Sequence, residues 1–306
     1  MSERYLVTGA NGLVGYAILK KLIADGQEVI AQVRDRVKLE VLGDIPATVT
    51  VIEQDITEPL EYDGKVDYII HGAAPTSSTF MVQSPVETID AIVHGSRNVL
   101  ELARIKGVKA MVYLSSMEVY GQSETDELLT EDKQFYLDPL AIRSDYPLGK
   151  RMAENLCVAY AYEYDVPVTI ARLAQVISQQ VLPDDNRIVA TVRRAVASRN
   201  NIVLATDGSS KQTYVGIDDA VTGIMTILAK GIKAQAYNVA NEETYCSIRE
   251  MAEYAASELV NSEISVYVEP NHDATKYPPA RKWNISSQKL RALDWQPRQK
   301  LKEMLG

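Results

Sequence analysis

The sequence predicts an α/β fold in which a doubly wound parallel sheet is joined to a smaller C-terminal α+β portion. Three observations support this fold class: apolar, strand-like runs alternate with helical segments, a glycine-rich turn follows the first run, and the alternation becomes less regular after about Gln175. Alternation of this kind is typical of a parallel sheet covered by helices on both faces. We therefore divide the chain into residues 1–175 and 176–306, allowing segments to cross between the two.

The bulk composition indicates a soluble globular protein. The 306 residues are 46% hydrophobic and 24% charged, which is enough to bury a large core. A net charge of −9 disfavours a nucleic acid partner. Two cysteines far apart in sequence, Cys157 and Cys246, argue against a disulfide framework, and no apolar run approaches membrane-spanning length. We expect a cytoplasmic protein that does not bind membranes.

The elements follow from periodicity and near-continuous apolar runs such as "AMVYLSS". The strand candidates are Arg4–Thr8, Glu28–Arg34, Thr48–Gln54, Val66–His71, Lys109–Ser115 and Val166–Ala171. The two long helix candidates are Pro85–Lys106 and Pro147–Tyr164. In the second portion, helices are expected over 186–200, 218–231 and 247–260, and strands over 202–205 and 236–241. The long acidic segment 121–145 is expected to be a lid or substrate loop.

A glycine-rich turn joins the first strand to the first helix in "RYLVTGANGLVG". Gly9 permits the turn, Gly12 lets the backbone approach a ligand, and Gly15 lets the helix pack on the strand. The following helix offers free N–H groups and a partial positive charge to a pyrophosphate. The gap between Gly9 and Gly12 is one residue longer than the first gap of the common dinucleotide fingerprint. Taken alone, this glycine-rich turn is also compatible with an ordinary strand–helix turn. It predicts a Rossmann-like dinucleotide-binding domain in residues 1–175.

Two further features suggest proton-transfer chemistry. Tyr146 and Lys150 in "DYPLGK" lie one helical turn apart, and a lysine beside a tyrosine can lower the phenol pKa toward neutrality. Ser115 and Ser116 end a predicted core strand, where a hydroxyl could hydrogen-bond the same substrate oxygen. Taken singly, Tyr146 and Lys150 could belong to a solvated helix face, and a serine at a strand end could stabilise the turn.

Together with "EQDI", "HGAA", "LSSMEVYG", "VGIDDAV" and "LRALDWQP", these stretches resemble the extended short-chain dehydrogenase/reductase family, specifically its nucleotide-sugar epimerase/dehydratase group. The resemblance spans almost the whole chain. It implies that Ser116, Tyr146 and Lys150 are catalytic and that a sugar hydroxyl, at C4, is oxidised to a ketone. It also implies that the cofactor contacts Tyr146, Lys150 and the following residues: Gly9, Asn11, Gly12, Leu13, Gly15, Asp55, Ile56, Gly72, Ala73 and Ala74.

The choice between NAD and NADP rests on the end of the second strand. An Asp or Glu that binds the ribose is expected there, but Val33 occupies the position and Arg34 follows it. An arginine can accept a 2′-phosphate, so we favour NADP over NAD. The alternative is that Arg34 is a surface residue that stacks on the adenine.

Departures from the family pattern leave the reaction type open. Met117 replaces an acid seen in enzymes that eliminate water, whereas Glu118 matches an acid of the dehydratases and nucleotide-sugar decarboxylases. Gln175 and Gln212 replace an expected Asn and a pyrophosphate-binding Arg, and Ile92 replaces a helix Asn. The alternatives are an NADPH-dependent carbonyl reductase and a non-catalytic dinucleotide-sensing regulator.

Two further expectations concern assembly and metals. The resemblance implies a homodimer in which the two long helices pair with their symmetry mates. Candidate outer residues are Ile89, Val93, Leu100, Leu156 and Tyr160, although these could equally face the sheet. We expect no metal site, because the histidines show no ligand spacing and are interpreted as structural: His71, His94 and His272.

Overall fold

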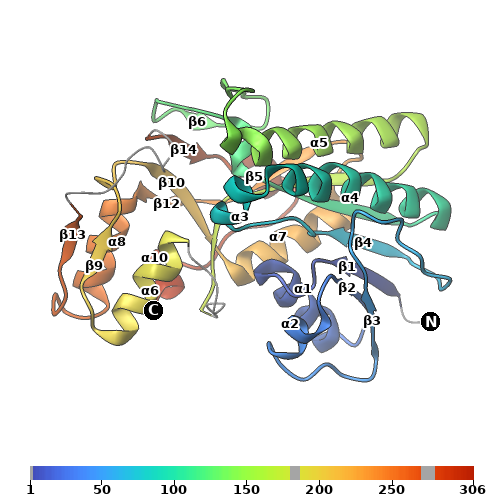
Figure 1. Ribbon diagram of the computed structural model, residues 1–306, viewed down its shortest axis with the longest axis horizontal. Coiled ribbons are helices and arrows are strands. Elements are labelled where there is room, and N and C mark those ends of the chain that lie inside the picture. The colour runs from blue at the N-terminus through green and yellow to red at the C-terminus, as the bar shows by residue number, and fades with distance from the viewer. Residues whose placement is uncertain (1–2, 180–186, 270–279) are drawn as a thin grey trace.

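The computed structural model describes residues 3–179, 187–269 and 280–306, and it confirms the predicted α/β class (Figure 1). Its main feature is a parallel sheet in the order β11-β7-β5-β4-β1-β2-β3. These strands are β1 (Arg4–Thr8), β2 (Glu28–Val33), β3 (Val49–Glu53), β4 (Tyr68–His71), β5 (Ala110–Ser116), β7 (Val168–Leu173) and β11 (Ala236–Val239). The strand order reverses between β1 and β4, so a crevice is expected at the carboxyl ends of these two strands.

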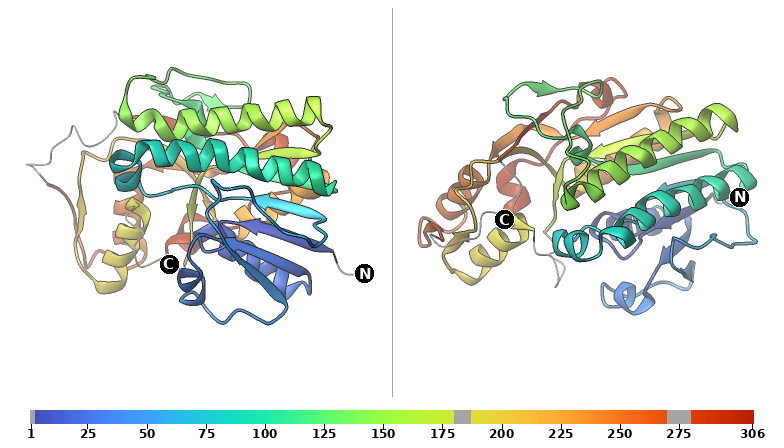
Figure 2. Two further views of the ribbon diagram at one scale, coloured as in Figure 1. Left: turned by 45° about the vertical axis from the view of Figure 1, so that its right-hand side comes forward. Right: turned by 45° about the horizontal axis from the view of Figure 1, so that its top comes forward.

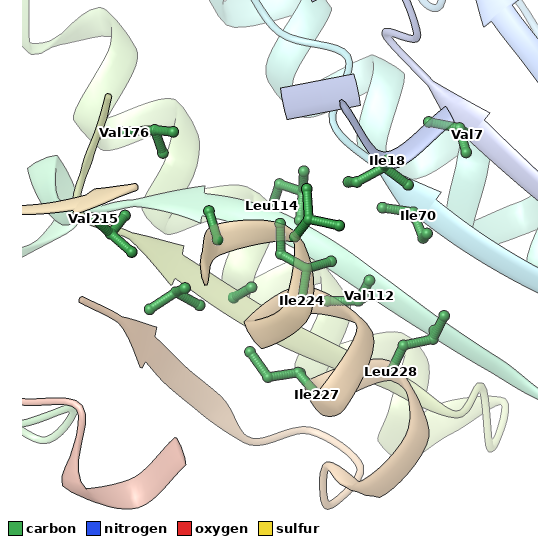
Figure 3. Close-up of a cluster of buried hydrophobic side chains, with 14 of the residues drawn as sticks. Val7, Ile18, Ile70, Val112, Leu114, Val176, Val215, Ile224, Ile227 and Leu228 are labelled. Atoms are coloured by element: carbon green, nitrogen blue, oxygen red, sulfur yellow. The ribbon is translucent and has the colours of Figure 1, made fainter. Parts of the chain in front are cut away.

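Helices cover both faces of this sheet, as near-continuous apolar strands require. They are α1 (Leu13–Ala24), α2 (Arg36–Glu40), α3 (Ser78–Gln83), α4 (Pro85–Lys106), α5 (Asp145–Glu163) and α7 (Ile217–Lys230). One core lies under α4 and α5, which run side by side in Figure 2. The other lies under α1 and α7, where Ile224 and Ile227 of α7 pack near Val112 and Leu114 of β5 (Figure 3).

The smaller portion has its own sheets and core. One sheet has the order β12-β10-β14-β6 with β8 beside β10, and a second joins β13 to β9. The strands are β6 (Leu128–Leu129), β8 (Gln175–Ile177), β9 (Ile202–Leu204), β10 (Lys211–Gly216), β12 (Asn241–Ser247), β13 (Val266–Val268) and β14 (Lys282–Ile285). The helices are α6 (Ile188–Ser198), α8 (Ile248–Glu258), α9 (Gln288–Arg291) and α10 (Leu301–Leu305). A core of fourteen buried apolar residues joins α6, α8 and α10 to these strands.

The predicted elements agree with the observed ones to within a few residues. The first strand and the helix over 85–106 have the predicted bounds. The helix expected over 186–200 starts at Asn186, which lies outside the described residues, and α6 begins at Ile188. The strand expected over 236–241 joins the large sheet as its edge strand β11, and α7 also packs there. Both come from beyond residue 175, a crossing that the proposed division allows.

The segment 121–145 is anchored rather than free. It follows the 3-10 turn η1 (Met117–Tyr120), contributes β6 to the small sheet, and ends in a second turn, η2 (Ile142–Ser144). Near its start, Asp126 forms ion pairs with Lys211 and Lys282 of the smaller portion. Arg151 of α5 donates to the carbonyl of Phe135. The segment therefore links α5 to the small sheet.

The outer faces of α4 and α5 include only part of the candidate set. Leu100 is fully buried in the core under the helices, so of the two alternatives left open it faces the sheet and not a partner. Ile89 of α4 is 42% exposed, and Met152 and Val158 of α5 are also exposed. In the described part of the chain, no helix combines the length and the apolar character needed to cross a membrane.

Candidate active site

The candidate residues gather at the carboxyl ends of β1, β4 and β5. Thr8 is in register with His71, and His71 is in register with Tyr113. The turns after these strands therefore open on the same edge of the sheet, beside the start of α1. This edge is the switch point at which open α/β sheets bind ligands.

The glycine-rich turn has the geometry expected of a phosphate cradle. Gly9 has φ of +68°, a conformation that side chains rarely adopt, and a Cβ there would lie 2.9 Å from the Ala73 backbone. Gly12 is the N-cap of α1, with no side-chain cap and no acidic residue in the first turn. At Gly15 a Cβ would lie 2.2 Å from the Gly9 carbonyl oxygen. The first-turn N–H groups of α1, which Leu13 begins, therefore suit an anionic ligand.

A buried hydroxyl connects this turn to the loop after β4. Thr8 Oγ1 accepts hydrogen bonds from the backbone N–H groups of Gly72 and Ala73, at 3.2 and 3.3 Å. It also lies 2.7 Å from His71 Nδ1, and His71 Nε2 lies 3.1 Å from Ser96 Oγ. Burial and the nearby Lys150 charge lower the pKa of His71 to about 3, so this imidazole is neutral at pH 7. His71 thus fixes the residues leading into Ala74.

His94 lies apart from this network. His94 lies on α4 and pairs with Asp90 one turn earlier. His272 lies outside the described residues.

At the end of β2, the structure places Arg34 on the surface after the fully buried Val33. The next residue, Asp35, caps α2 by accepting from two backbone N–H groups, and its carbonyl accepts from Asn11 Nδ2 at 3.4 Å. No acid therefore occupies the position that Val33 fills. The Arg34 side chain is exposed at this edge of the sheet.

The adenine-side residues Asp55 and Ile56 follow β3. The Asp55 carboxylate accepts from the backbone N–H and the hydroxyl of Thr57, which lower the pKa of this carboxyl against the effect of burial. Ile56 is buried against Gly95 of α4, and its carbonyl accepts from Asn98. Asp55 therefore holds its own loop while lying near Arg34, whose charge also lowers its pKa.

The three proposed catalytic side chains converge at the end of β5. Tyr146 and Lys150 lie in the first turns of α5, and both are buried. Lys150 Nζ donates to the Leu114 carbonyl at 2.8 Å and lies 5.8 Å from the Tyr146 ring centre. Ser116 is partly accessible, caps η1 through its hydroxyl, and interacts with the Tyr146 phenol. The preceding Ser115 instead donates to Glu154 at 2.6 Å, so the two serines have different hydrogen-bond partners.

The electrostatics of the pair differ from the expectation of a lowered phenol pKa. Burial, followed by the Glu118 charge, raises the pKa of Tyr146 above its usual value, and interactions with Ser116, Arg143 and Arg187 oppose this only in part. Burial also lowers the pKa of Lys150 to about 7, although the carboxylate of Glu154 favours its charged form. Desolvation therefore outweighs the mutual stabilisation that the Tyr-x-x-x-Lys spacing suggests.

Glu118 lies beside the tyrosine and is held by an arginine from the long loop. Its carboxylate forms an ion pair with Arg143 Nη2 at 3.1 Å, and the two side chains are 17% and 23% exposed. The Arg143 guanidinium lies 5.8 Å from the Tyr146 ring centre, and its Nη1 is buried without a hydrogen-bond partner among the described residues. The carboxylate of Asp145 likewise has one buried oxygen without such a partner. These orphaned polar atoms indicate that a polar ligand belongs here.

Two arginines of this region were missed from the sequence. Arg143 lies only three residues before Tyr146, a signal that the sequence offered. Arg281 follows a segment outside the described residues; its guanidinium stacks 4.0 Å from the Trp283 ring centre, and its pKa is lowered chiefly by burial. Glu118 and Arg143 both act electrostatically on Arg281. Positive groups thus cluster around the tyrosine in a protein whose net charge is −9.

The residues that depart from the family pattern lie within regular helices and strands. Ile92 is buried in α4 and meets Gly149 of α5. Gln175 begins β8, opposite Tyr214. Gln212 lies within β10, and the neighbouring Lys211 is engaged by Asp126. The expected pyrophosphate-binding arginine is therefore absent from this position.

Comparisons with known proteins identify the family of this chain. The family model described as "NAD dependent epimerase/dehydratase family" matches residues 5–240. UDP-glucuronic acid decarboxylase 6 of Arabidopsis thaliana is 30% identical over 312 residues, covering 99% of this chain and 86% of the relative. UDP-glucuronic acid decarboxylase 1 of Danio rerio is 30% identical, covering 99% and 71%.

Solved structures show the same fold. A UDP-glucose 4-epimerase from Thermotoga maritima superposes with a TM-score of 0.84 at 22% identity, covering 99% of this chain and 96% of that one. A dTDP-glucose 4,6-dehydratase from Bacillus anthracis superposes with a TM-score of 0.81 at 19% identity, covering 99% and 94%. On the family match and the relatives at 30% identity, this chain belongs to the NAD dependent epimerase/dehydratase family.

Proposed function

We propose that this chain oxidises the C4 hydroxyl of a nucleotide sugar, with Tyr146 as the proton acceptor. The observation that carries the proposal is the convergence of Ser116, Tyr146 and Lys150 at the end of β5, beside a phosphate cradle. Ser116 would orient the sugar hydroxyl, and Lys150 would stabilise the phenolate and bind a ribose hydroxyl. The bound nicotinamide supplies the hydride chemistry.

We propose NADP as the cofactor within this NAD-dependent family. Arg34 is exposed where the ribose-binding acid would lie, and Val33 offers no carboxylate to a 2′-hydroxyl. The glycine-rich turn and the loop at Gly72 and Ala73 would hold the pyrophosphate and the centre of the cofactor. Residues 1–175 would form most of this cofactor-binding domain, and 176–306 most of the substrate portion.

A specific observation favours decarboxylation among the possible reactions. Glu118 is paired with Arg143, whose second guanidinium nitrogen is buried without a partner among the described residues. A carboxylate on sugar C5 would accept a charge-assisted hydrogen bond from this second guanidinium nitrogen of Arg143. After C4 becomes a ketone, such a sugar is a β-keto acid, which loses carbon dioxide readily, and a proton from solvent, relayed through Glu118, would then be added at C5. UDP-glucuronic acid, which the names of the curated relatives specify, carries such a carboxylate on C5.

The test is a substrate panel with product analysis. The protein is incubated with UDP-glucuronic acid, UDP-glucose or dTDP-glucose and a trace of NAD or NADP, and products are followed by NMR. The proposal predicts conversion of at least one nucleotide sugar without net consumption of cofactor. Stoichiometric loss of NADPH with a simple carbonyl substrate would favour a reductase, and ligand-dependent stabilisation without turnover would favour a regulator.

A further inference from the structure

A buried polar network that the proposed chemistry does not use lies beneath the catalytic helix. Glu154 is one helical turn after Lys150 on α5, and Arg172 is on β7, the strand next to β5. Arg172 Nε and Nη2 donate to the two oxygens of Glu154 at 2.9 and 2.8 Å. The side chains of Arg172 and Glu154 are 10% and 11% exposed, so this is a buried, bidentate ion pair.

Successive residues of β5 are bound by successive turns of α5. The Leu114 carbonyl accepts from Lys150 Nζ at 2.8 Å, and the Ser115 hydroxyl donates to Glu154 Oε1 at 2.6 Å. These two contacts fix the start of α5 on the strand that ends in Ser116. Glu154 cannot move without disturbing the strand that also holds Lys150.

The network continues into the long loop. Arg172 Nη1 donates to the Glu131 carbonyl at 2.8 Å, and the Glu131 carboxylate accepts from the backbone N–H of Asn238 at 2.8 Å. The amide oxygen of Asn238 accepts from the Tyr120 hydroxyl at 2.7 Å. Arg172 therefore connects α5 to the segment that supplies Arg143.

We propose that Glu154 is a positioning residue for Lys150: its carboxylate, fixed by Arg172 and Ser115, keeps the buried ammonium group protonated and seated on β5. The inference rests on the proposed function, because it assigns Glu154 a role through Lys150. Among the described residues, the other titratable groups that interact with this ammonium are Tyr113, Tyr146, Cys157 and the neutral His71. Glu154 is thus the carboxylate that opposes the desolvation of Lys150.

The consequence is a defined effect on proton transfer. Because burial brings the pKa of Lys150 to about 7, a lost negative charge nearby moves its titration below neutrality. At pH 6.5 the wild-type Lys150 would still be mostly charged, whereas in the variant it would be mostly uncharged and would no longer stabilise the Tyr146 phenolate. We expect Glu154→Gln to slow the oxidation step at that pH while leaving substrate affinity nearly unchanged.

The experiment measures Lys150 directly, without turnover. The full chain is labelled with ¹³C at lysine Cε, the Lys150 signal is assigned with Lys150→Met, and the signal is followed by NMR against pH. Glu154→Gln should shift the Lys150 titration downward by about one pH unit. Glu163→Gln removes the same charge from the exposed end of α5 and should shift nothing.

Unchanged titration in Glu154→Gln would overturn the proposal. If that variant does not fold, because Arg172 is left buried and unpaired, Glu154→Gln/Arg172→Gln removes both charges. It should show a smaller downward shift, because losing the Arg172 charge acts in the opposite sense but Glu154 acts more strongly on Lys150. An unchanged titration in the double variant would equally overturn it. A protein that converts no nucleotide sugar, yet shows the shift, would reject the proposed function and retain the role of Glu154.

Discussion

Replacing Gly15 by alanine tests the packing on which the cofactor site depends. A Cβ at Gly15 would lie 2.2 Å from the Gly9 carbonyl oxygen and 2.9 Å from its carbonyl carbon, whereas ordinary contact begins at 3.4 Å. The helix or the turn must therefore move by about 1.2 Å, the difference between 3.4 and 2.2 Å. Overpacking of this kind costs about 1–3 kcal/mol, which corresponds to a fall in melting temperature of roughly 2–10 °C.

The matched control is Gly12→Ala in the same turn. Its Cβ would meet only the Gly9 carbonyl oxygen, at 3.3 Å, so a few tenths of an ångström of adjustment suffice. We expect Gly12→Ala to keep a nearly normal melting temperature but to weaken cofactor binding, because the Cβ intrudes where the backbone approaches the pyrophosphate. Circular dichroism measures stability, and calorimetry measures NAD and NADP binding. Wild-type stability and affinity in Gly15→Ala would refute the described packing.

Three further predictions address specificity, chemistry and assembly. Arg34→Ala should weaken NADP binding by about 1.5–3 kcal/mol, tenfold or more, with little effect on NAD; equal losses in calorimetry would indicate adenine stacking instead. Glu118→Gln should still reduce bound cofactor in a single turnover but stall with a keto-sugar, and normal product formation would show that Glu118 serves only its ion pair with Arg143. The protein should be a homodimer through α4 and α5, with a light-scattering mass of about 68 kDa, twice 33.9 kDa; a monomeric mass at micromolar concentration would reject this.

Local signals made much of the fold predictable. The amphipathic pattern of α1 places Ile18 and Leu22 in the core, and Gly26, with φ of +71°, follows its end. The pairing of β11 with β7 was not predictable in the same way, because it joins segments more than sixty residues apart. The orientation of Leu100 on α4 could not be decided from the sequence, because periodicity identifies an apolar stripe without saying what covers it.

The site was predictable where residues recur at fixed spacing and not where partners are distant. Tyr146 and Lys150 were found from one turn of helix, and the choice of Ser116 over Ser115 agrees with the different hydrogen bonds of the two serines. Glu154 and Arg172 lie on different elements, so their pairing could not be read from a sequence. The raised pKa of Tyr146 depends on burial, which spacing does not reveal.

The most direct test of the account follows one deuterium atom. A nucleotide sugar that the protein converts is deuterated at C4, and the cofactor is analysed by mass spectrometry after rapid quenching early in a single turnover, before the keto-sugar is reduced again. The account predicts deuterium on the cofactor with the wild-type protein and almost none with Tyr146→Phe, whose cofactor affinity should stay nearly normal because only the phenol hydroxyl is lost. Conversion without transfer of deuterium, or equal transfer in Tyr146→Phe, would contradict C4 oxidation with Tyr146 as its base.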